Sequence, residues 1–136
     1  MDLDEARAVI AEQHHVVLAT LRRDGTPQMS PVLAAVDDEG RVMVSSRQTA
    51  FKVRNLRRDP RAWLCVLSDD FFGRWIQVGG RARIVELPAA MDGLVDYYRR
   101  ISGEHPDWDD YRSAMQRDAR VLVQIELASA GPDRQG

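Results

Sequence analysis

The sequence predicts a mainly β protein, a small six-stranded antiparallel barrel with short helices inserted between the strands. Two observations support this class: six apolar or alternating stretches of strand length, and turn signals that join most of them as hairpins. The chain has 136 residues, of which 44% are hydrophobic and 29% charged, as in an ordinary globular domain. We therefore expect one domain over residues 1–136, with a frayed tail at residues 131–136.

The first third of the chain predicts one helix and a hairpin. Residues 3–13 form an amphipathic helix whose apolar side consists of Leu3, Ala6, Val9 and Ile10. The strand that follows ends at the turn signal Asp24-Gly25, and residues 26–36 are its antiparallel partner. Pro27 and Pro31 cannot donate hydrogen bonds to a ladder, so this partner is expected at a sheet edge. One of its faces is polar and carries Gln28 and Ser30.

A third strand, ending in VMVSS, leads directly into a short helix that is stopped by Pro60. Thr49 is the expected N-cap of this helix. A helix start presents free backbone N–H groups and the positive end of the helix dipole, which together favour phosphate. Lys52 lies in the first turn and is the one lysine among nineteen basic residues. A lysine is a compact point charge that suits a phosphate, although an ordinary surface lysine is the alternative. Further cations nearby are Arg47, Arg54, Arg57 and Arg58.

The second half of the chain predicts three more strands and two helices. The strands are expected at residues 61–69, 73–87 and 119–129, and the helices at residues 88–103 and 105–118. Trp75 and Gln77 share one face of the long fifth strand. Gly79-Gly80 in the same strand indicates a bulge or a close backbone approach.

Composition and motifs exclude several classes of function. The formal charge of −2 gives no global basic field, so nucleic-acid binding is disfavoured. Cys65 is the only cysteine and lies in an apolar run, where it is expected to pack as a small hydrophobe. No signal peptide or membrane-spanning stretch is apparent, so we expect a cytoplasmic protein without a membrane partner. The sequence contains no nucleotide-binding loop, metal-ligand spacing or catalytic triad, and no catalytic residue can be named from it.

The chain resembles the flavin and deazaflavin split-barrel oxidoreductases related to pyridoxamine 5′-phosphate oxidase. The resemblance is carried by the stretches LATLRRDGTPQMSPV, VSS…K…NLRRDPR and GGRARIVE. A later run, YYRRISGEHPDWDDYRSAM…RVLVQI, resembles the actinobacterial branch that uses coenzyme F420, a deazaflavin. The likeness extends from about residue 16 to residue 128.

The resemblance implies a coenzyme F420-dependent oxidoreductase that transfers a hydride from the reduced deazaflavin to a small conjugated acceptor. It implies a homodimer of six-stranded antiparallel split β-barrels, with two cofactor sites lined by both chains. The residues that it assigns to the cofactor phosphate are Lys52, Ser45, Ser46, Arg47 and Thr49. The residues that it assigns to the ring and pocket wall are Gln28, Ser30, Pro31, Val32, Trp75 and Gln77, the last two from either chain.

One position departs from the family pattern. Relatives often carry an arginine two residues before the lysine, where this sequence has Ala50. Either Arg47 reaches the same phosphate from the preceding turn, or the site is weaker. Three alternatives therefore stay open: an FMN-binding oxidoreductase of the same fold, a non-catalytic F420 or flavin carrier, and a dimer that binds only adventitious anions.

Two features of the residues themselves favour a dimer and F420. Trp63, Trp75 and Trp108, with the apolar strands, supply more apolar surface than one small barrel needs, which indicates an interface. The resemblance brings in a cofactor with a phosphodiester and a lactyl-oligoglutamate tail, which carries more negative charge over a longer reach than FMN. The arginines around the short helix suit such a polyanion, so tighter binding of F420 than of FMN is expected.

Overall fold

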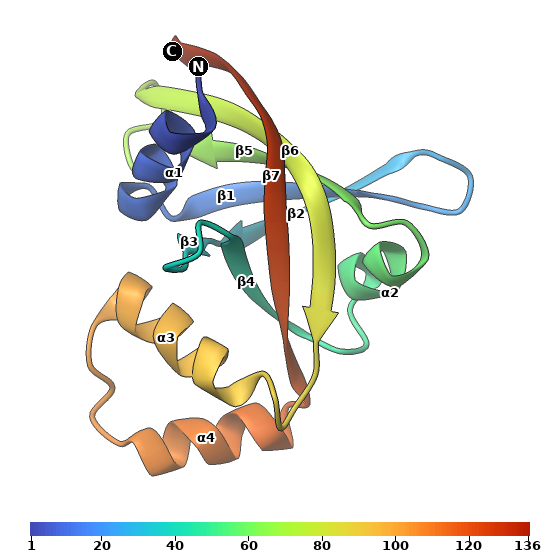
Figure 1. Ribbon diagram of the computed structural model, residues 1–136, viewed down its shortest axis with the longest axis vertical. Coiled ribbons are helices and arrows are strands. Elements are labelled where there is room, and N and C mark those ends of the chain that lie inside the picture. The colour runs from blue at the N-terminus through green and yellow to red at the C-terminus, as the bar shows by residue number, and fades with distance from the viewer.

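The structure is a computed structural model that describes residues 1–136. Its elements are α1 (Leu3–Glu12), β1 (His15–Leu21), β2 (Pro27–Leu33), β3 (Ala35–Val36), β4 (Val42–Arg47), α2 (Phe51–Arg58), β5 (Arg61–Leu67), β6 (Arg74–Val85), α3 (Met91–Ser102), α4 (Trp108–Arg117) and β7 (Arg120–Gln135). The strands form one antiparallel sheet in the order β2-β1-β5-β6-β7-β4-β3, which curls into an open barrel (Figure 1). The predicted antiparallel split barrel is confirmed, with seven strands in place of six.

The seventh strand arises because the predicted second strand is interrupted at Ala34. The N–H of Ala34 donates to the carbonyl of His14 at 2.9 Å, and this is the last hydrogen bond between β2 and the β1 side of the sheet. The chain then crosses to the other edge of the sheet, where Ala35 and Val36 pair with β4. A continuous apolar run gives no sign of this change of partner, since both halves have the same strand character.

The sheet does not close between β2 and β4, and the two prolines of β2 contribute to this. The N–H of Ala34 points to β1, so the odd-numbered residues of β2 present their backbone groups to the free edge. Pro27 and Pro31 are odd-numbered and have no N–H to donate there. Strands β2 and β4 contact one another without a hydrogen-bonded ladder. The predicted edge position of β2 is therefore confirmed, and it leaves a split in the barrel.

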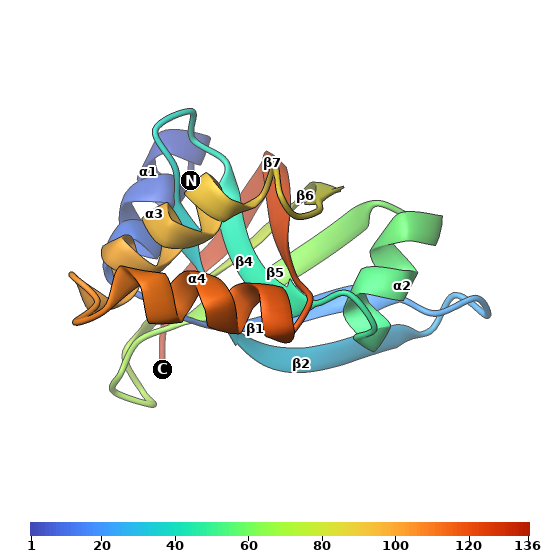
Figure 2. The ribbon, with the colours of Figure 1, turned by 90° about the horizontal axis from the view of Figure 1, so that it is seen from below.

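Two apolar clusters hold the fold together. The larger one fills the barrel and includes the fully buried side chains of Ile10, Leu18, Leu64 and Ile76. The smaller one lies between the sheet and α3 and α4, and its centre is Leu94, packed with Leu122 of β7. Because α3 and α4 cover one side of β4 while α2 lies on the other side, the two clusters are separated by the sheet (Figure 2).

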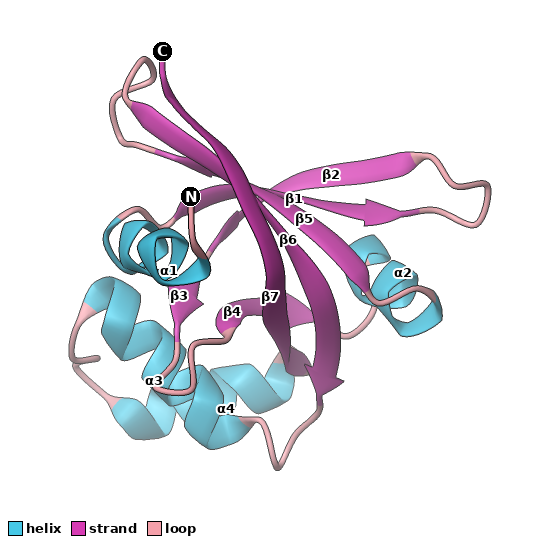
Figure 3. Cartoon of the chain, turned by 45° about the horizontal axis from the view of Figure 1, so that its top comes forward, coloured by secondary structure: helices cyan, strands magenta, loops and turns pink.

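The longest pairing in the sheet joins β6 to β7, which run side by side (Figure 3). The register shifts between Gly79 and Gly80, as the paired glycines predicted. A Cβ atom on Gly80 would overlap the carbonyl oxygen of Glu126, so the close approach requires glycine.

The expectation of a frayed tail is wrong, because β7 continues to Gln135. The guanidinium of Arg74 on β6 donates to both carboxylate oxygens of Asp133, at 2.9 and 2.8 Å. This bidentate pair and the ladder extend the strand through residues that sequence patterns assign to a tail.

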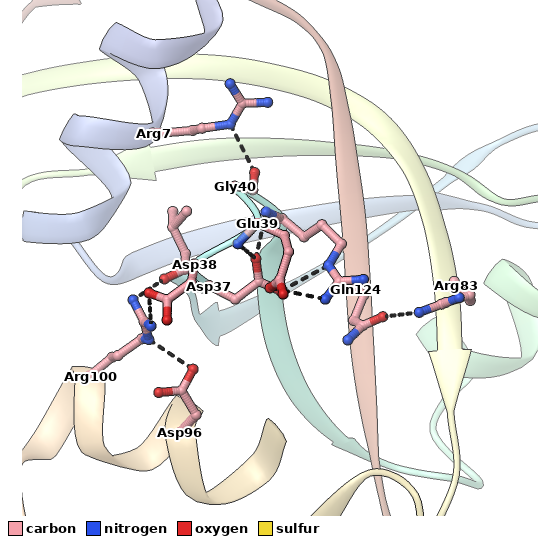
Figure 4. A network of polar contacts seen from close by, with 11 residues as sticks. Arg7, Asp37, Asp38, Glu39, Gly40, Arg83, Asp96, Arg100 and Gln124 are labelled. Carbon is pink, nitrogen blue, oxygen red and sulfur yellow. Dashed lines mark hydrogen bonds and ion pairs between the residues drawn. The ribbon is translucent and has the colours of Figure 1, made fainter. Parts of the chain in front are cut away.

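A polar network fixes the turn between β3 and β4 (Figure 4). Arg7 of α1 donates to the carbonyl of Gly40 at 2.8 Å. From the other side, Arg100 of α3 donates to Asp38 at 2.7 Å and to Asp96 at 2.9 Å. Helices at opposite ends of the chain therefore hold β4 from both sides.

The helical pair α3–α4 begins and ends close to the predicted residues. Pro88 lies in a turn before α3 and does not open the helix, which starts at Met91. Gly103 ends it with φ 81°, as predicted, because glycine adopts this backbone conformation without strain. Asp107 caps α4 by accepting from the N–H of Asp110. None of the four helices has the length and apolar character needed to span a membrane.

An aromatic cluster joins α3 to α4. The rings of Tyr98, His105, Trp108 and Tyr111 lie with centroids 5.1 to 5.8 Å apart. Tyr111 is buried, and its hydroxyl donates to the carbonyl of Leu94 at 2.7 Å. Burial raises the pKa of Tyr111 to about 12. Trp108 is partly buried against this pair of helices.

We predict that Tyr111→Phe lowers the free energy of unfolding by about 1 kcal/mol, the usual net value of one buried hydrogen bond. Tyr98→Phe is the matched control, because the Tyr98 hydroxyl has no hydrogen-bond partner in the protein while its ring packs in the same cluster. Urea unfolding of both variants measures the difference. Equal stability of the two variants would contradict the assigned role of the Tyr111 hydroxyl.

Candidate functional site

The start of α2 is open to a ligand. Its N-cap is Ala50, which provides no side-chain hydrogen bond. The expectation that Thr49 caps this helix is wrong: Thr49 lies exposed in the preceding turn. As a result, the backbone N–H groups of Phe51 and Lys52 have no partner in the protein. Such free N–H groups, together with the helix dipole, favour an anion.

Lys52 is a half-buried cation without a counter-ion. It forms no ion pair with any carboxylate. Burial lowers the pKa of Lys52, and the nearby charge of Arg120 lowers it further. A cation whose charged form is disfavoured in this way gains most when an anion binds beside it.

Polar side chains from three elements line the split between β2 and β4. The hydroxyl of Ser30 on β2 is buried and has no hydrogen-bond partner. On β4, the backbone of Ser45 lies close to the hydroxyl of Tyr97 from α3. That hydroxyl donates to the carbonyl of Leu33, at the end of β2, at 2.8 Å. Burial raises the pKa of Tyr97, so its hydroxyl stays protonated and bridges the two unpaired edges.

Gln28 lies at the end of a hydrogen-bonded chain that starts on α2. Arg58 donates to the side-chain oxygen of Asn55 at 3.0 Å, and Asn55 donates to the hydroxyl of Thr20 at 3.0 Å. Thr20 is fully buried, and its hydroxyl lies 3.4 Å from the amide oxygen of Gln28. The chain fixes Gln28 at the wall of a pocket of about 260 Å³ that Phe51 also lines.

An arginine-rich cleft of about 800 Å³ separates α2 from the β1–β2 hairpin. It is lined by Arg22, Arg23, Asp24, Phe51, Arg54, Asn55, Arg57 and Arg58. Arg57 is engaged by Glu86 at 2.7 Å, and Arg58 donates to the carbonyl of Leu21. Arg23 and Arg54 form no ion pair, so their charges are available to a ligand. Phe51 is 72% exposed at the edge of this cleft.

The other residues predicted to bind the cofactor phosphate differ in their exposure to solvent. Ser46 is 3% exposed, on the face of β4 opposite Ser45, and its hydroxyl contacts the carbonyl of Arg47. Arg47 is exposed and lies opposite Arg120 in the β4–β7 ladder.

Four residues of β2 were predicted to contact the ring of the cofactor, and their side chains do not all lie on one face of the strand. Gln28, Ser30 and Val32 alternate with Met29 and Pro31, so they point to the half-buried side of β2. Val32 packs against the barrel core. Pro31 is exposed on the outer side, beside Val17.

Trp75 and Gln77 lie on the outer face of the sheet. Gln77 is opposite Cys65 on β5, which is opposite Val17 on β1. Ile76 and Val78, which alternate with them, are buried in the barrel. The sheet therefore separates Trp75 and Gln77 from the start of α2 within one chain.

The sequence gives no sign that four residues distant from α2 in the chain lie near it in the structure. Arg120 and Tyr97 approach Lys52 and Ser45 only because β7 pairs with β4 and α3 packs over the split. Arg22 and Arg23 follow β1 and reach the cleft because the hairpin folds toward α2. Only their basic character can be read from the chain, and that character is shared by eighteen arginines.

The arrangement suits a flat, anionic cofactor. The open helix start and Lys52 offer an anion site, and the unpartnered Ser30 hydroxyl and the fixed Gln28 offer polar contacts along β2. No group at the site has the geometry of an activated nucleophile with an adjacent base. The chain itself is therefore equipped to bind and orient a ligand that brings its own chemistry.

Comparisons with known proteins agree with this description. The family model described as pyridoxamine 5′-phosphate oxidase matches residues 3–130. The chain is similar to the F420H(2)-dependent biliverdin reductase of Mycobacterium tuberculosis, with 26% identity over 125 residues, which are 91% of this chain and 82% of that protein.

Two solved structures have the same fold. A conserved hypothetical protein of Mycobacterium tuberculosis superimposes with a TM-score of 0.79 and 27% identity, over 99% of this chain and 85% of that one. A structure named F420 reductase superimposes with a TM-score of 0.70 and 23% identity, over 92% of this chain and 94% of that one.

Proposed function

The chain belongs to the pyridoxamine 5′-phosphate oxidase family, and from this premise we propose that it is a coenzyme F420-dependent oxidoreductase. Its substrate is a small conjugated acceptor that receives a hydride from the reduced deazaflavin. The observation that carries the proposal is the unpaired Lys52 at an uncapped helix start, beside a split lined by the unpartnered Ser30. The similarity to a protein named F420H(2)-dependent biliverdin reductase supports the choice of cofactor.

In the proposed complex, the anionic and flat parts of the cofactor use different elements. The phosphodiester binds Lys52 and the free N–H groups of the first turn of α2, with Ser45 and Arg47 nearby. The ring lies along β2, where Gln28 and Ser30 supply polar contacts and Val32 an apolar one. When bound, reduced deazaflavin supplies the hydride by its own chemistry. The protein residues bind and orient it and keep water away from the acceptor.

The arginine-rich cleft is the proposed place of the oligoglutamate tail. Its free arginines, Arg23 and Arg54, lie on the hairpin and on α2, so they face a long anion from two sides. FMN ends at its phosphate and has no group to occupy this cleft. This supports F420 over the FMN alternative, and binding without turnover would support the carrier alternative.

A second copy of the chain completes the proposed site. The outer face of β1, β2 and β5 is largely apolar and partly exposed, and it includes Val17, Met29, Pro31, Leu33, Trp63, Cys65 and Leu67. Trp75 and Gln77 lie at the border of this face and cannot reach Lys52 of their own chain. A homodimer through the outer face buries the apolar surface and brings these two residues to the partner's pocket.

The acceptor is the least constrained part of the proposal. The relative's printed name makes biliverdin the first acceptor to test, with quinones and enones as smaller conjugated comparators. Oxidation of reduced F420, followed by its absorbance in the presence of each acceptor, tests the activity directly. Cofactor binding without oxidation by any acceptor would favour the carrier.

We predict that Lys52→Ala weakens F420 binding by roughly 1.5–3 kcal/mol, the value of a hydrogen bond to a charged group. Folding changes little, because Lys52 has no ion pair to lose. Arg112→Ala is the matched control: it removes one exposed, unpaired cation from α4. Calorimetric titration of F420 into both variants measures the effect, and wild-type affinity in Lys52→Ala would remove Lys52 from the site.

We predict that the protein binds F420 more tightly than FMN, and that salt weakens F420 binding more steeply, since the tail adds screened contacts. Arg54→Ala reduces this difference in salt dependence, because it removes one free cation from the cleft. Titrations of both cofactors at several salt concentrations provide the measurement. Equal or tighter FMN binding at physiological salt would overturn the F420 assignment in favour of FMN.

We predict that the protein is a dimer at micromolar concentration and that Val17→Asp makes it monomeric, because a charge would be buried at the centre of the outer face. Ser113→Asp, on the exposed side of α4, adds the same charge away from this face and leaves the dimer intact. Light scattering after size-exclusion chromatography distinguishes the states. A monomeric wild-type protein would refute the shared site.

A further inference from the structure

Arg120, the first residue of β7, is a second half-buried cation without a counter-ion. It forms no ion pair, and its Nε atom is buried without a hydrogen-bond acceptor. A buried charged donor that lacks an acceptor is costly to a folded protein. Arginine Nε–H groups of this kind are commonly satisfied by carboxylates or phosphates, which a guanidinium binds with two parallel bonds.

The backbone around Arg120 is held in an uncommon conformation. Ala119, directly before it, has φ 49° and is the one residue other than glycine with a positive φ. The carbonyl of Ala119 accepts from the N–H of Gln48 at 3.0 Å. The start of β7 is therefore tied to the segment that leads into α2, and Arg120 is kept at a fixed position relative to Lys52. Strained residues of this kind gather at binding sites.

Three ionisable groups lie within reach of the charge of Arg120. It lowers the pKa of Lys52, although burial has the larger effect there. It also lowers the pKa of Tyr97 and Tyr111, against the larger raising effect of burial in both. Arg47 lies opposite it on β4. Arg120 is thus surrounded by two cations and two tyrosines. The positive charges repel one another unless an anion lies between them.

The one acidic residue that lines the pocket beside Arg120 is already paired with another arginine. Arg120 lines a pocket of about 320 Å³ together with Gln48, Glu86, Leu87, Gln116, Ala119 and Val121. Glu86 is bound by Arg57 at 2.7 Å, and it forms no ion pair with Arg120. The amide groups of Gln48 and Gln116 offer further donors, so the space beside Arg120 is suited to an anionic group.

We propose that Arg120 and Lys52 form a two-cation clamp for one phosphate-class anion, with Arg120 as a cofactor-binding residue contributed by β7. Within the proposed function, on which this assignment of the ligand rests, the anion is the phosphodiester of F420. The second cation comes from a distant strand, while Arg47 remains exposed.

The single lysine of the chain allows a direct test that needs no cofactor. Reductive methylation with a ¹³C label gives one lysine NMR signal, whose pH titration reports the pKa of Lys52. Arg120→Gln raises this pKa because it removes a neighbouring positive charge. Inorganic phosphate raises the pKa in the wild-type protein and has a smaller effect in Arg120→Gln. Arg117→Gln, an exposed cation at the end of α4, is the matched control and leaves both responses unchanged.

Cofactor titration provides the second arm. Arg120→Gln raises the Kd of F420 and of FMN roughly tenfold to a hundredfold, as expected for one charged hydrogen bond. Arg120→Lys, which retains the charge but loses the planar fork, recovers part of this loss, and it serves as the folded comparator if the glutamine variant is unstable. Arg117→Gln binds both cofactors like the wild-type protein.

The two arms separate the clamp from the proposed function. If Arg120→Gln leaves the Lys52 pKa, its response to phosphate and the F420 affinity unchanged, the clamp is overturned while F420 binding stands. If the wild-type protein binds neither cofactor but phosphate shifts the Lys52 signal in an Arg120-dependent way, the clamp is supported and the proposed function fails. An identical effect of Arg117→Gln would also overturn the clamp, because general charge would then explain the result.

Discussion

The missing closure between β2 and β4 is the constraint on which the rest of the structure depends. A closed barrel would fill its interior with side chains and leave no polar backbone at an edge. Here Pro27 and Pro31 remove two of the four backbone donors that β2 would present at its free edge, and β4 forms no ladder against it. The open seam exposes polar groups of both strands at the point where α2 begins. The prolines of β2 thus favour the open edge at which the candidate site lies.

The elements around the seam are held by interactions that leave the seam itself open. Tyr97 lies between the two edges, and its hydroxyl donates a hydrogen bond to the carbonyl of Leu33. This carbonyl therefore has a partner although the sheet stays open. The network of Arg7 and Arg100 around the β3–β4 turn holds β4 in place from two helices. The large barrel core and the small helical core lie on either side of β4. The strand that ends at the site is therefore rigid, which is what a binding residue at its end requires.

Electrostatics gives the seam its chemical character. Lys52 and Arg120 are held near one another without a carboxylate, although the chain as a whole carries a formal charge of −2. Some other cations near α2 are engaged, as Arg57 is by Glu86 and Arg58 by the hairpin backbone, while Arg23 and Arg54 are free. The two half-buried cations, Lys52 and Arg120, stay unpaired at a cost in stability, which favours a binding role for them. Net charge and composition do not reveal such a place.

The sequence by itself determined most of the strand and helix pattern, the edge position of β2 and the bulge at Gly79-Gly80, and it made Lys52 a candidate. These depend on local geometry: proline lacks a donor, glycine lacks a Cβ atom, and apolar periodicity follows the backbone. The tertiary structure alone decided the rest. It split the second strand at Ala34, extended β7 through Asp133, moved the helix cap from Thr49 to Ala50, and brought Arg120 to Lys52. Each of these depends on which distant segment lies alongside, and pairing between distant segments is set by packing that local patterns do not encode.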